Sequence, residues 1–256
     1  MSRIEKAFEN GKAFIGFITG GDPCPEKTEE FVLAMIDGGA DIIEIGIPFS
    51  DPVAEGPTIQ NANIRALSAG TTTDNLFAVV RNLRKKTQTP LLFMTYLNPV
   101  FHYGYERFFA ECKRVGVDGI IIPDLPFEER GEVAGIAGSH KIDLITMVAP
   151  TSAERTEKLV SEASGFIYTV AAMGVTGVRS KLDENAGALL DHVKSKSRIP
   201  VAAGFGIGTP EQARQATGHA DGIIVGSAIV RIVEQYGKDA GCHIREFVSE
   251  MKDAIK

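Results

Sequence analysis

The feature that most limits the possible folds is a regular alternation of short apolar runs with longer amphipathic stretches. Patterns such as "YERFFAECKRVG" between the runs have helical periodicity and end on a glycine, as helices commonly do. Strands that alternate with helices form parallel sheets, and eight such units favour a closed (β/α)₈ barrel. The eight runs, rich in β-branched residues, are 14–19, 41–47, 91–96, 119–123, 143–149, 166–170, 200–205 and 222–226.

An open doubly wound sheet is the alternative fold. It would carry a G-x-G-x-x-G turn after its first strand, whereas "FITGGDPCP" has glycines without that spacing. The length of 256 residues suits one barrel, and no Pro/Ser/Gly-rich linker divides the chain. We therefore predict a single domain over residues 1–256, with a short helix near residues 2–10 that closes the bottom of the barrel.

Composition excludes several classes of function. The net charge of −6 argues against nucleic acid as a partner, because phosphate backbones require clustered Lys and Arg. Three cysteines, far apart and odd in number, predict a reducing compartment and no disulfide framework. No apolar run approaches the ~18 residues of a membrane span, and the first residues lack a signal core. We expect a cytoplasmic protein that does not act on a membrane.

Two of the strand–helix units are longer than the others, and each extra segment follows a strand. In barrel enzymes the loops after the strands carry the active site. The second unit contains "EIGIPFSDPVAEGPTIQ" and the sixth contains "AAMGVTGVRSKLDE", which has the glycines and small residues of a mobile lid.

Carboxylates are the reactive side chains at the predicted strand ends. No lysine lies there, which disfavours a Schiff-base aldolase, and the five histidines show no paired metal-ligand spacing. We therefore expect no metal site. The candidates are Asp22, Glu44, Asp51, Glu55 and Asp124.

Glu44 is the strongest candidate, because it interrupts the apolar run "DIIEIGI". Period-two alternation places Ile43, Ile45 and Ile47 on one face of the strand and Glu44 on the other, toward the barrel interior. Burial should raise the pKa of this carboxyl group, which suits a residue that both donates and accepts a proton. The alternative is a buried glutamate satisfied by backbone or hydroxyl partners.

The other four carboxylates lie in loops. Glu55 is either a functional residue or a solvated loop acid. Asp51 precedes a proline and is best interpreted as a turn former. Asp22 is a candidate cap for the first barrel helix, and Asp124 is either a cap or a residue that faces a partner.

Two glycine loops near the C-terminus predict a phosphate site. "AGFGIGTPEQA" follows the seventh strand and "VGSAIV" follows the eighth, and each leads directly into a helix. Backbone N–H groups at such helix N-termini bind phosphate in many barrels. Neither loop carries a lysine, so binding would depend on amides and the helix dipole. The alternative is that these glycines only permit tight turns.

These segments resemble the tryptophan synthase α subunit family. The similarity extends in order over essentially the whole chain, through "FITGGDP", "EIGIPFSDPVAEGPTIQNA", "MTYLNPVFHYG", "VDGIIIPDLPFEE", "YTVAAMGVTG", "AGFGI" and "IVGSAIV". The resemblance implies a (β/α)₈ barrel that cleaves indole-3-glycerol phosphate to indole and glyceraldehyde 3-phosphate. It also implies no metal or organic cofactor in this subunit, and a partner β subunit with pyridoxal phosphate in an α₂β₂ complex.

The resemblance further implies roles for individual residues. Glu44 matches the acid/base glutamate, Tyr168 matches a tyrosine beside it, and Glu55 stands where the family usually has an aspartate that contacts the indole N–H. The remaining matches are Gly177, Gly206, Gly226 and Ser227 for the phosphate; Phe17, Tyr96, Ile121 and Phe205 for the indole pocket; Thr176 for the lid; and Asp22 and Asp124 for communication with the β subunit.

Two other functions are compatible with parts of the sequence. A sugar-phosphate isomerase or epimerase would explain the phosphate loops, but not the two carboxylates beside an aromatic pocket. A module that mainly regulates a partner would explain the resemblance without activity of its own. Glu55 raises a separate question, since a side chain one methylene longer than aspartate displaces the carboxylate unless the backbone retreats.

Overall fold

The computed structural model describes residues 1–150, 155–170, 184–204 and 206–256. Nine parallel strands form one sheet in the order β5-β4-β3-β2-β1-β9-β8-β7-β6. Their bounds are β1 (Ala13–Thr19), β2 (Ile42–Gly46), β3 (Leu91–Met94), β4 (Gly119–Ile121), β5 (Asp143–Leu144), β6 (Thr146–Val148), β7 (Ile167–Val170), β8 (Val201–Gly204) and β9 (Gly222–Val225).

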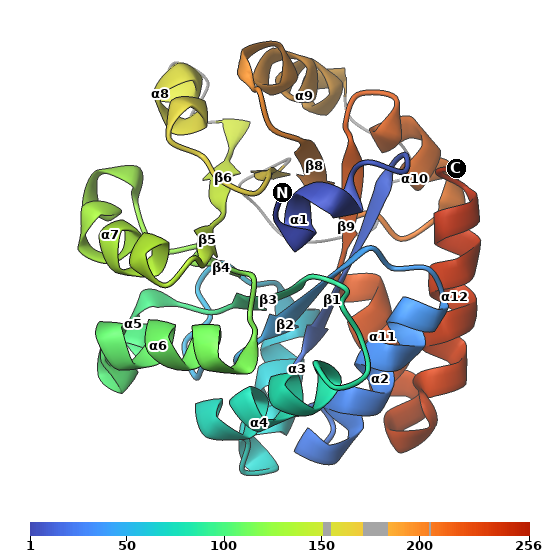
Figure 1. Ribbon diagram of the computed structural model, residues 1–256. Coiled ribbons are helices and arrows are strands. Elements are labelled where there is room, and N and C mark those ends of the chain that lie inside the picture. Colours follow the sequence, from blue (N-terminus) through green and yellow to red (C-terminus); the bar gives the residue numbers. More distant parts are fainter. Residues whose placement is uncertain (151–154, 171–183, 205) are drawn as a thin grey trace.

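The two ends of this sheet are joined by the chain itself. Strands β5 and β6 are separated only by Ile145; β5 pairs with β4, and β6 pairs with β7. They are two halves of the single strand predicted at 143–149, so the nine strands correspond to the eight predicted ones (Figure 1). The (β/α)₈ barrel is confirmed, and the open sheet is excluded.

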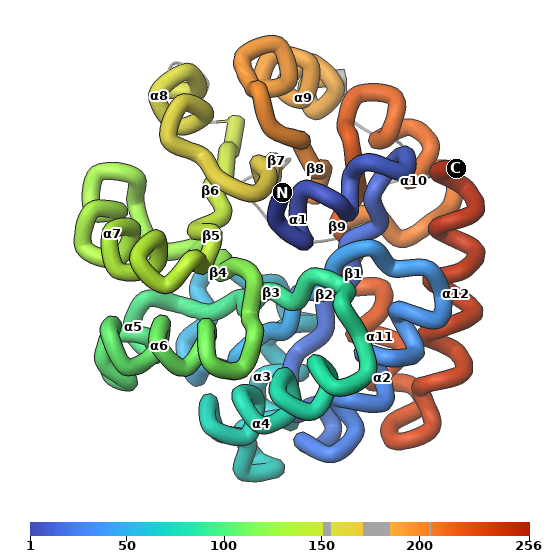
Figure 2. The backbone as a smooth tube through the Cα atoms, viewed as in Figure 1, coloured from blue at the N-terminus to red at the C-terminus, as the bar shows by residue number. Residues whose placement is uncertain are grey.

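Helices surround the barrel, as the backbone trace shows (Figure 2). The second unit contains two helices, α3 (Pro57–Ser68) and α4 (Thr73–Leu83), so part of its extra length is an additional helix rather than a long loop. The helices are α1 (Arg3–Ala7), α2 (Pro25–Asp37), α3 (Pro57–Ser68), α4 (Thr73–Leu83), α5 (Leu97–Tyr103), α6 (Tyr105–Val115), α7 (Gly131–Ser139), α8 (Thr156–Ser161), α9 (Glu184–Lys196), α10 (Pro210–Thr217), α11 (Ser227–Tyr236) and α12 (Gly241–Asp253), with 3₁₀ turns at Phe127–Glu129 and Gly237–Asp239.

Helix α1 closes one end of the barrel, as predicted. Ser2 and Glu5 form a capping box that starts this helix, with Ser2 N donating to Glu5 Oε2 at 2.7 Å. Ile4 is fully buried and packs among inward-facing strand residues. The interior cluster consists of Ile4, Ile15, Ile42, Leu92, Ile121, Ile145, Phe166, Ala202 and Ile224.

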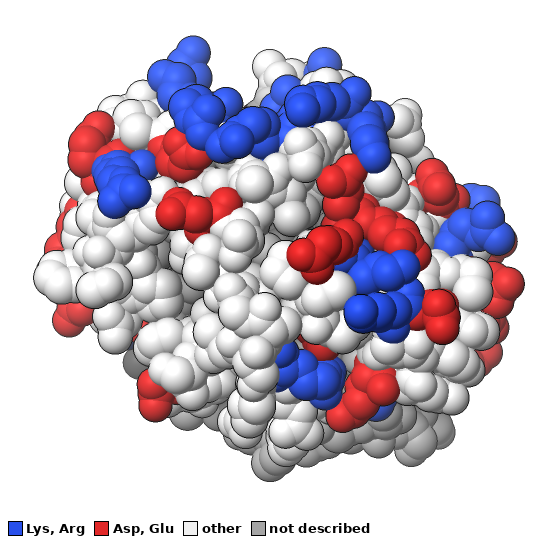
Figure 3. Space-filling model, turned by 90° about the horizontal axis from the view of Figure 1, so that it is seen from below, with Lys and Arg blue, Asp and Glu red and all other residues white. Residues whose placement is uncertain are grey.

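The larger apolar core lies between the barrel wall and the helices. Ile43, Ile45 and Ile47 belong to this outer core, whereas Ile42 belongs to the interior cluster, so the predicted alternation along β2 is confirmed. Ion pairs such as Lys86–Glu29 connect outer segments, here the turn after α4 with α2. The view from below shows a band of basic side chains along the top, basic and acidic side chains side by side at the right, and large uncharged areas between them (Figure 3). Exposed pairs of this kind contribute little, so the core supplies most of the stability.

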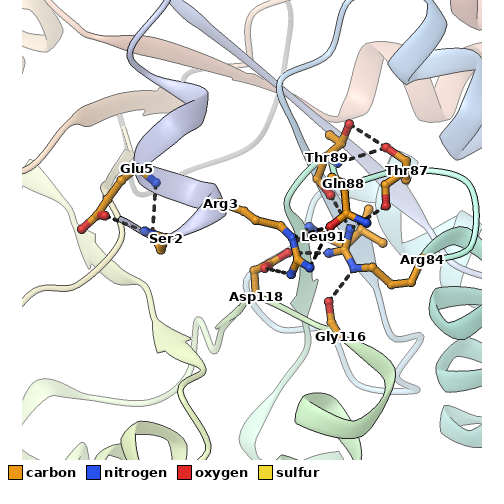
Figure 4. A network of polar contacts seen from close by, with 10 residues as sticks. All are labelled: Ser2, Arg3, Glu5, Arg84, Thr87, Gln88, Thr89, Leu91, Gly116 and Asp118. Atoms are coloured by element: carbon orange, nitrogen blue, oxygen red, sulfur yellow. Dashed lines mark hydrogen bonds and ion pairs between the residues drawn. The ribbon is translucent and has the colours of Figure 1, made fainter.

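A network of polar contacts centred on Asp118 holds the end of the barrel where the strands begin (Figure 4). Asp118 Oδ1 pairs with Arg3 Nη1 at 2.9 Å, and Oδ2 accepts the N–H of Leu91 at 2.9 Å and pairs with Arg84. Arg84 also donates from Nε to the carbonyl oxygen of Gly116 at 2.7 Å. The network therefore ties helix α1 and the end of α4 to the start of β3 and β4.

A similar arrangement, an aspartate that binds both a backbone N–H and a cation, occurs at two further places at this end of the barrel. Asp41 Oδ2 accepts the N–H of Phe14 at 2.7 Å and pairs with Lys252. Asp221 accepts the N–H of Val201 at 3.1 Å and pairs with Lys194. In each case an aspartate just before one strand satisfies a backbone donor at the start of its neighbour.

Candidate active site

Glu44 is a buried carboxyl group without a hydrogen-bond partner among the described residues. It lies on β2 between Phe17 of β1 and Leu92 of β3, its exposed fraction is 0%, and neither oxygen is hydrogen-bonded. Burial, reinforced by the charge of Glu55, raises the pKa of Glu44 to about 8. The alternative of a glutamate satisfied by backbone or hydroxyl groups therefore finds no support in the described part of the chain. The group is protonated at neutral pH and able to donate a proton.

Glu55 lies in the short loop between β2 and α3, and its side chain is half-buried. Its N–H donates to the carbonyl oxygen of Pro52 at 3.0 Å, and helix α3 begins immediately afterward with Gly56 as N-cap and Pro57 as its first residue. Burial raises the pKa of Glu55 to about 7, which disagrees with a freely solvated loop acid. Because its charge also raises the pKa of Glu44, the two carboxyl groups act within one electrostatic environment.

Tyr168 of β7 completes this group. Burial, followed by the charges of Glu44 and Glu55, raises its pKa well above the ordinary value. A Cβ atom on Gly204 of β8 would overlap the Tyr168 ring, so this glycine leaves the space that the ring occupies. The phenol is therefore held protonated near both carboxyl groups.

Aromatic and apolar side chains form the wall around the carboxyl groups. Phe17 is 6% exposed and packs against Ile59 and Val230. A Cβ atom on Gly226 would lie 3.2 Å from its ring, so that glycine also makes room for an aromatic residue. Tyr96 is buried at the mouth, and Ile121 lies deeper, in the interior cluster. Phe205 lies outside the described residues.

The two helix N-termini expected at the phosphate site differ. Helix α10 is capped by its own side chains, because Gln212 Oε1 accepts the N–H groups of Gly208 at 2.8 Å and Thr209 at 3.2 Å. Helix α11 starts after Gly226 with no acidic residue in its first turn and, within the described part of the chain, with no side-chain cap. Its N-terminal amides, together with the Gly206 segment (φ +68°), are the better match to an anion. Gly177 lies outside the described residues.

Arg231 is a residue that the sequence interpretation missed. Its Nη2 atom lies 3.7 Å from the position of a Cβ atom on Gly208, and it has no ion pair with another described residue. It follows Ser227 by four residues on α11, and helical side chains tilt toward the helix N-terminus. From this four-residue spacing, the sequence predicts that the Arg231 guanidinium lies beside Ser227 and the predicted phosphate loops.

Three other predicted residues have specific contacts. Asp22 is 1% exposed and binds Arg65 of α3 through two hydrogen bonds of 2.8 Å. It does not cap α2, whose N-cap is Cys24, so that prediction was wrong. Asp124 Oδ1 accepts the N–H of Leu97 at 2.9 Å and therefore caps α5 from the neighbouring loop. Asp51 lies in the turn before Val53, as expected. Thr176 lies outside the described residues.

A cavity of about 840 Å³ opens beside Glu55. It extends along Pro123 after β4, Met147 of β6 and Val170 at the end of β7, and its outer part reaches Phe127. Glu44 is not in its lining and lies on the β2 side of the mouth. The volume is in the range of small-molecule sites. Among the described residues there is no cluster of three His, Cys, Asp or Glu suited to a metal, and no helix long and apolar enough to cross a membrane.

Comparison with known proteins identifies the family. The sequence matches the family described as tryptophan synthase alpha chain over residues 4–256. It is 47% identical to the tryptophan synthase alpha chain of Lacticaseibacillus casei, over 100% of this chain and 96% of that protein. The chain belongs to the tryptophan synthase alpha chain family. Its members are lyases of tryptophan biosynthesis, and their known activity is cleavage of indole-3-glycerol phosphate.

Solved structures of this family have the same fold. The tryptophan synthase subunit alpha of Legionella pneumophila superposes with a TM-score of 0.90 at 37% identity, over 100% of this chain and 98% of that one. A chain from a structural study of the tryptophan synthase a2b2 complex of Pyrococcus furiosus superposes with a TM-score of 0.89 at 37% identity, over 95% of this chain and 99% of that one. The resemblance predicted from the sequence is confirmed across essentially the whole chain.

Proposed function

We propose that this chain cleaves indole-3-glycerol phosphate by carboxylate acid/base catalysis, with Glu44 as the residue that transfers the protons. The observation that carries this assignment is the buried carboxyl group of Glu44, which has no partner among the described residues and a pKa of about 8. Protonated Glu44 donates its proton to C3 of the indole ring. The resulting carboxylate then accepts the proton of the glycerol hydroxyl while the carbon–carbon bond breaks. The bonding electrons return to the ring, and Glu44 regains its starting protonation state.

Glu55 provides the negative charge that this reaction requires near the indole nitrogen. Protonation of C3 places positive charge on the ring, and a fixed carboxylate stabilises it in a site that excludes water. The two pKa values, about 8 for Glu44 and about 7 for Glu55, favour a proton on Glu44 and a charge on Glu55 at slightly alkaline pH. The environments of the two groups therefore support different roles.

The rest of the mouth supports recognition of the substrate. Phe17, Tyr96, Ile121 and Phe205 are proposed to bind the indole ring, with Tyr168 beside the catalytic carboxyl group. Gly177, Gly206, Gly226 and Ser227 are proposed to bind the phosphate through backbone amides, and Thr176 to belong to the lid. None of these groups requires a metal or an organic cofactor in this chain.

A tryptophan synthase β subunit is the proposed partner, in an α₂β₂ complex and with pyridoxal phosphate as its own cofactor. Val53, 82% exposed in the Glu55 loop, and Phe101, 67% exposed on α5, are large apolar side chains in segments that follow neighbouring strands. Contact with them would join the partner directly to the loop that carries Glu55. Asp22 and Asp124 fix adjacent loops and are proposed to transmit that contact.

Release of indole tests the proposal. The isolated protein is incubated with indole-3-glycerol phosphate, and free indole is measured before and after addition of a β subunit. We expect slow cleavage by the isolated chain and faster cleavage with the partner, as the lid closes. Absence of indole under both conditions would contradict the lyase assignment and leave a purely regulatory role.

A further inference from the structure

The loop between β2 and α3 is held by side chains on both sides of Glu55. Tyr96 Oη accepts the N–H of Ala54, the residue before Glu55, at 2.9 Å. Gln60 Nε2 donates to the carbonyl oxygen of Glu55 at 2.9 Å. Tyr96 comes from the end of the neighbouring strand and Gln60 from helix α3, so two separate elements fix the backbone that carries the carboxylate.

The position of Tyr96 is itself well determined. The side chain is 4% exposed, and its ring packs against Phe49 with a centroid distance of 5.4 Å. Burial, followed by the charge of Glu55, raises the pKa of the phenol, which keeps it protonated and shows that Glu55 lies within electrostatic range. A rigid, protonated phenol therefore stands between the floor of the mouth and the Glu55 loop.

We propose that Tyr96 is a positioning residue for Glu55, acting through its hydroxyl group and the N–H of Ala54, in addition to the apolar contact of its ring. The inference rests on the proposed role of Glu55. A glutamate has one more rotatable bond than aspartate, so its carboxylate reaches a fixed point only if its backbone is fixed. Tyr96 and Gln60 supply that constraint from two directions.

Loss of the hydroxyl should therefore affect turnover more than binding. In Tyr96→Phe the ring remains but the N–H of Ala54 loses its acceptor, and the loop relaxes. Because a shift of ~1 Å at a reacting group can cost on the order of 100-fold, we expect kcat to fall about tenfold. The KM for indole-3-glycerol phosphate should stay within about twofold, since the apolar wall is intact.

Tyr103→Phe is the matched control. Tyr103 is the last residue of α5, the helix whose N-cap is Tyr96, and its hydroxyl donates to Asp74 Oδ1 at 2.7 Å, outside the mouth. The same atom is removed from the same residue type, at the other end of α5. We expect kcat and KM of Tyr103→Phe to equal those of the wild-type protein.

A double-mutant cycle with Glu55→Gln tests the proposal. If Tyr96 acts through Glu55, Tyr96→Phe lowers kcat about tenfold in the wild-type background and by less than twofold in the Glu55→Gln background. The same tenfold loss in both backgrounds, or no loss in either, would overturn it. Gln60→Met, which removes the second constraint with little change in volume, should show a smaller loss with the same dependence on Glu55.

The cycle separates this inference from the proposed function. Near-normal turnover by Glu55→Gln alone would remove Glu55 from the mechanism, whatever Tyr96 does. Impaired Glu55→Gln with an independent effect of Tyr96→Phe would leave the mechanism intact and reject the positioning role only. Thermal unfolding of each variant reports whether a loss of kcat reflects the folded protein.

Discussion

Asp118 and Glu44 are two carboxyl residues of one barrel with opposite surroundings. Asp118, at the end where the strands begin, binds Arg3, Arg84 and the N–H of Leu91 (Figure 4). Glu44, further along its strand toward the mouth, is fully buried and has no hydrogen-bond partner among the described residues. Donors stabilise the ionised form of a carboxyl group, whereas a buried carboxyl group without donors has a raised pKa and keeps a proton that it can transfer. The contrast separates the stabilising end of the barrel from the reactive end.

The largest expected difference between the two residues is in their contribution to catalytic activity. Glu44→Gln should lower kcat for cleavage at least ~1,000-fold while the substrate still binds, because the amide cannot exchange a proton. Asp118→Asn should change kcat by less than about twofold. Steady-state release of indole measures kcat for both variants. More than a tenth of normal turnover by Glu44→Gln would contradict the role of Glu44 in proton transfer.

The next effect is on stability, to which we expect Asp118 to contribute more than Glu44. Asp118→Asn leaves Arg84 and Arg3 without a carboxylate and should lower the free energy of unfolding by about 3 kcal/mol. Asp253→Asn is the control, since Asp253 pairs with Lys256 on the surface and its removal should have no measurable effect. Urea denaturation of the two variants gives the difference, and equal stabilities would show that the Asp118 network is not structural.

Within the reactive end, Glu55 provides a test of charge against length. Glu55→Gln removes the negative charge and should lower kcat about 100-fold. Glu55→Asp keeps the charge and should be partly active, with a kcat between those of the wild-type protein and Glu55→Gln. The ratio of the kcat values of the two variants shows whether the charge or the length of the side chain matters more. Near-normal turnover by the Gln variant would mean that the charge at position 55 is dispensable.

The raised pKa of Glu44 predicts a pH dependence of stability. Between pH 5 and 7 the folded protein retains on Glu44 a proton that the unfolded chain has lost, since the pKa changes from 4.5 to about 8 on folding. The stability of the wild-type protein should therefore fall as pH rises, by about 2 kcal/mol relative to Glu44→Gln over this interval. Parallel stability curves for the two proteins would contradict the assigned pKa.

The smallest predicted effect concerns Arg231, at the rim of the mouth. If its guanidinium attracts the substrate phosphate, Arg231→Gln should raise KM about threefold at low ionic strength and leave kcat unchanged. The difference should disappear at high salt because the side chain is exposed. Lys238→Gln, on the surface after α11, is the control and should leave KM unchanged.

Much of the reactive end could be predicted from particular residues. Glu44 stood out because a carboxylate in a run of isoleucines has few purely structural explanations. The split of the fifth strand at Ile145 could not be predicted, because it depends on which neighbours each half pairs with. The three aspartates that precede β2, β4 and β9 share a local pattern, an Asp followed by Ile or Gly and further isoleucines, but the backbone donors that they satisfy belong to neighbouring strands.

The alternation of strands and helices, the inward direction of Glu44 and the family can all be recognised along the chain, because they follow from local periodicity and from motifs in order. Other features exist only in the folded protein. Within the described residues, Glu44 has no hydrogen-bond partner while Asp118 has three, α10 has a side-chain cap that α11 lacks, and Tyr96 holds the loop of Glu55. Hydrogen bonds and desolvation depend on side chains brought together from distant segments, and that proximity exists only once the barrel has closed.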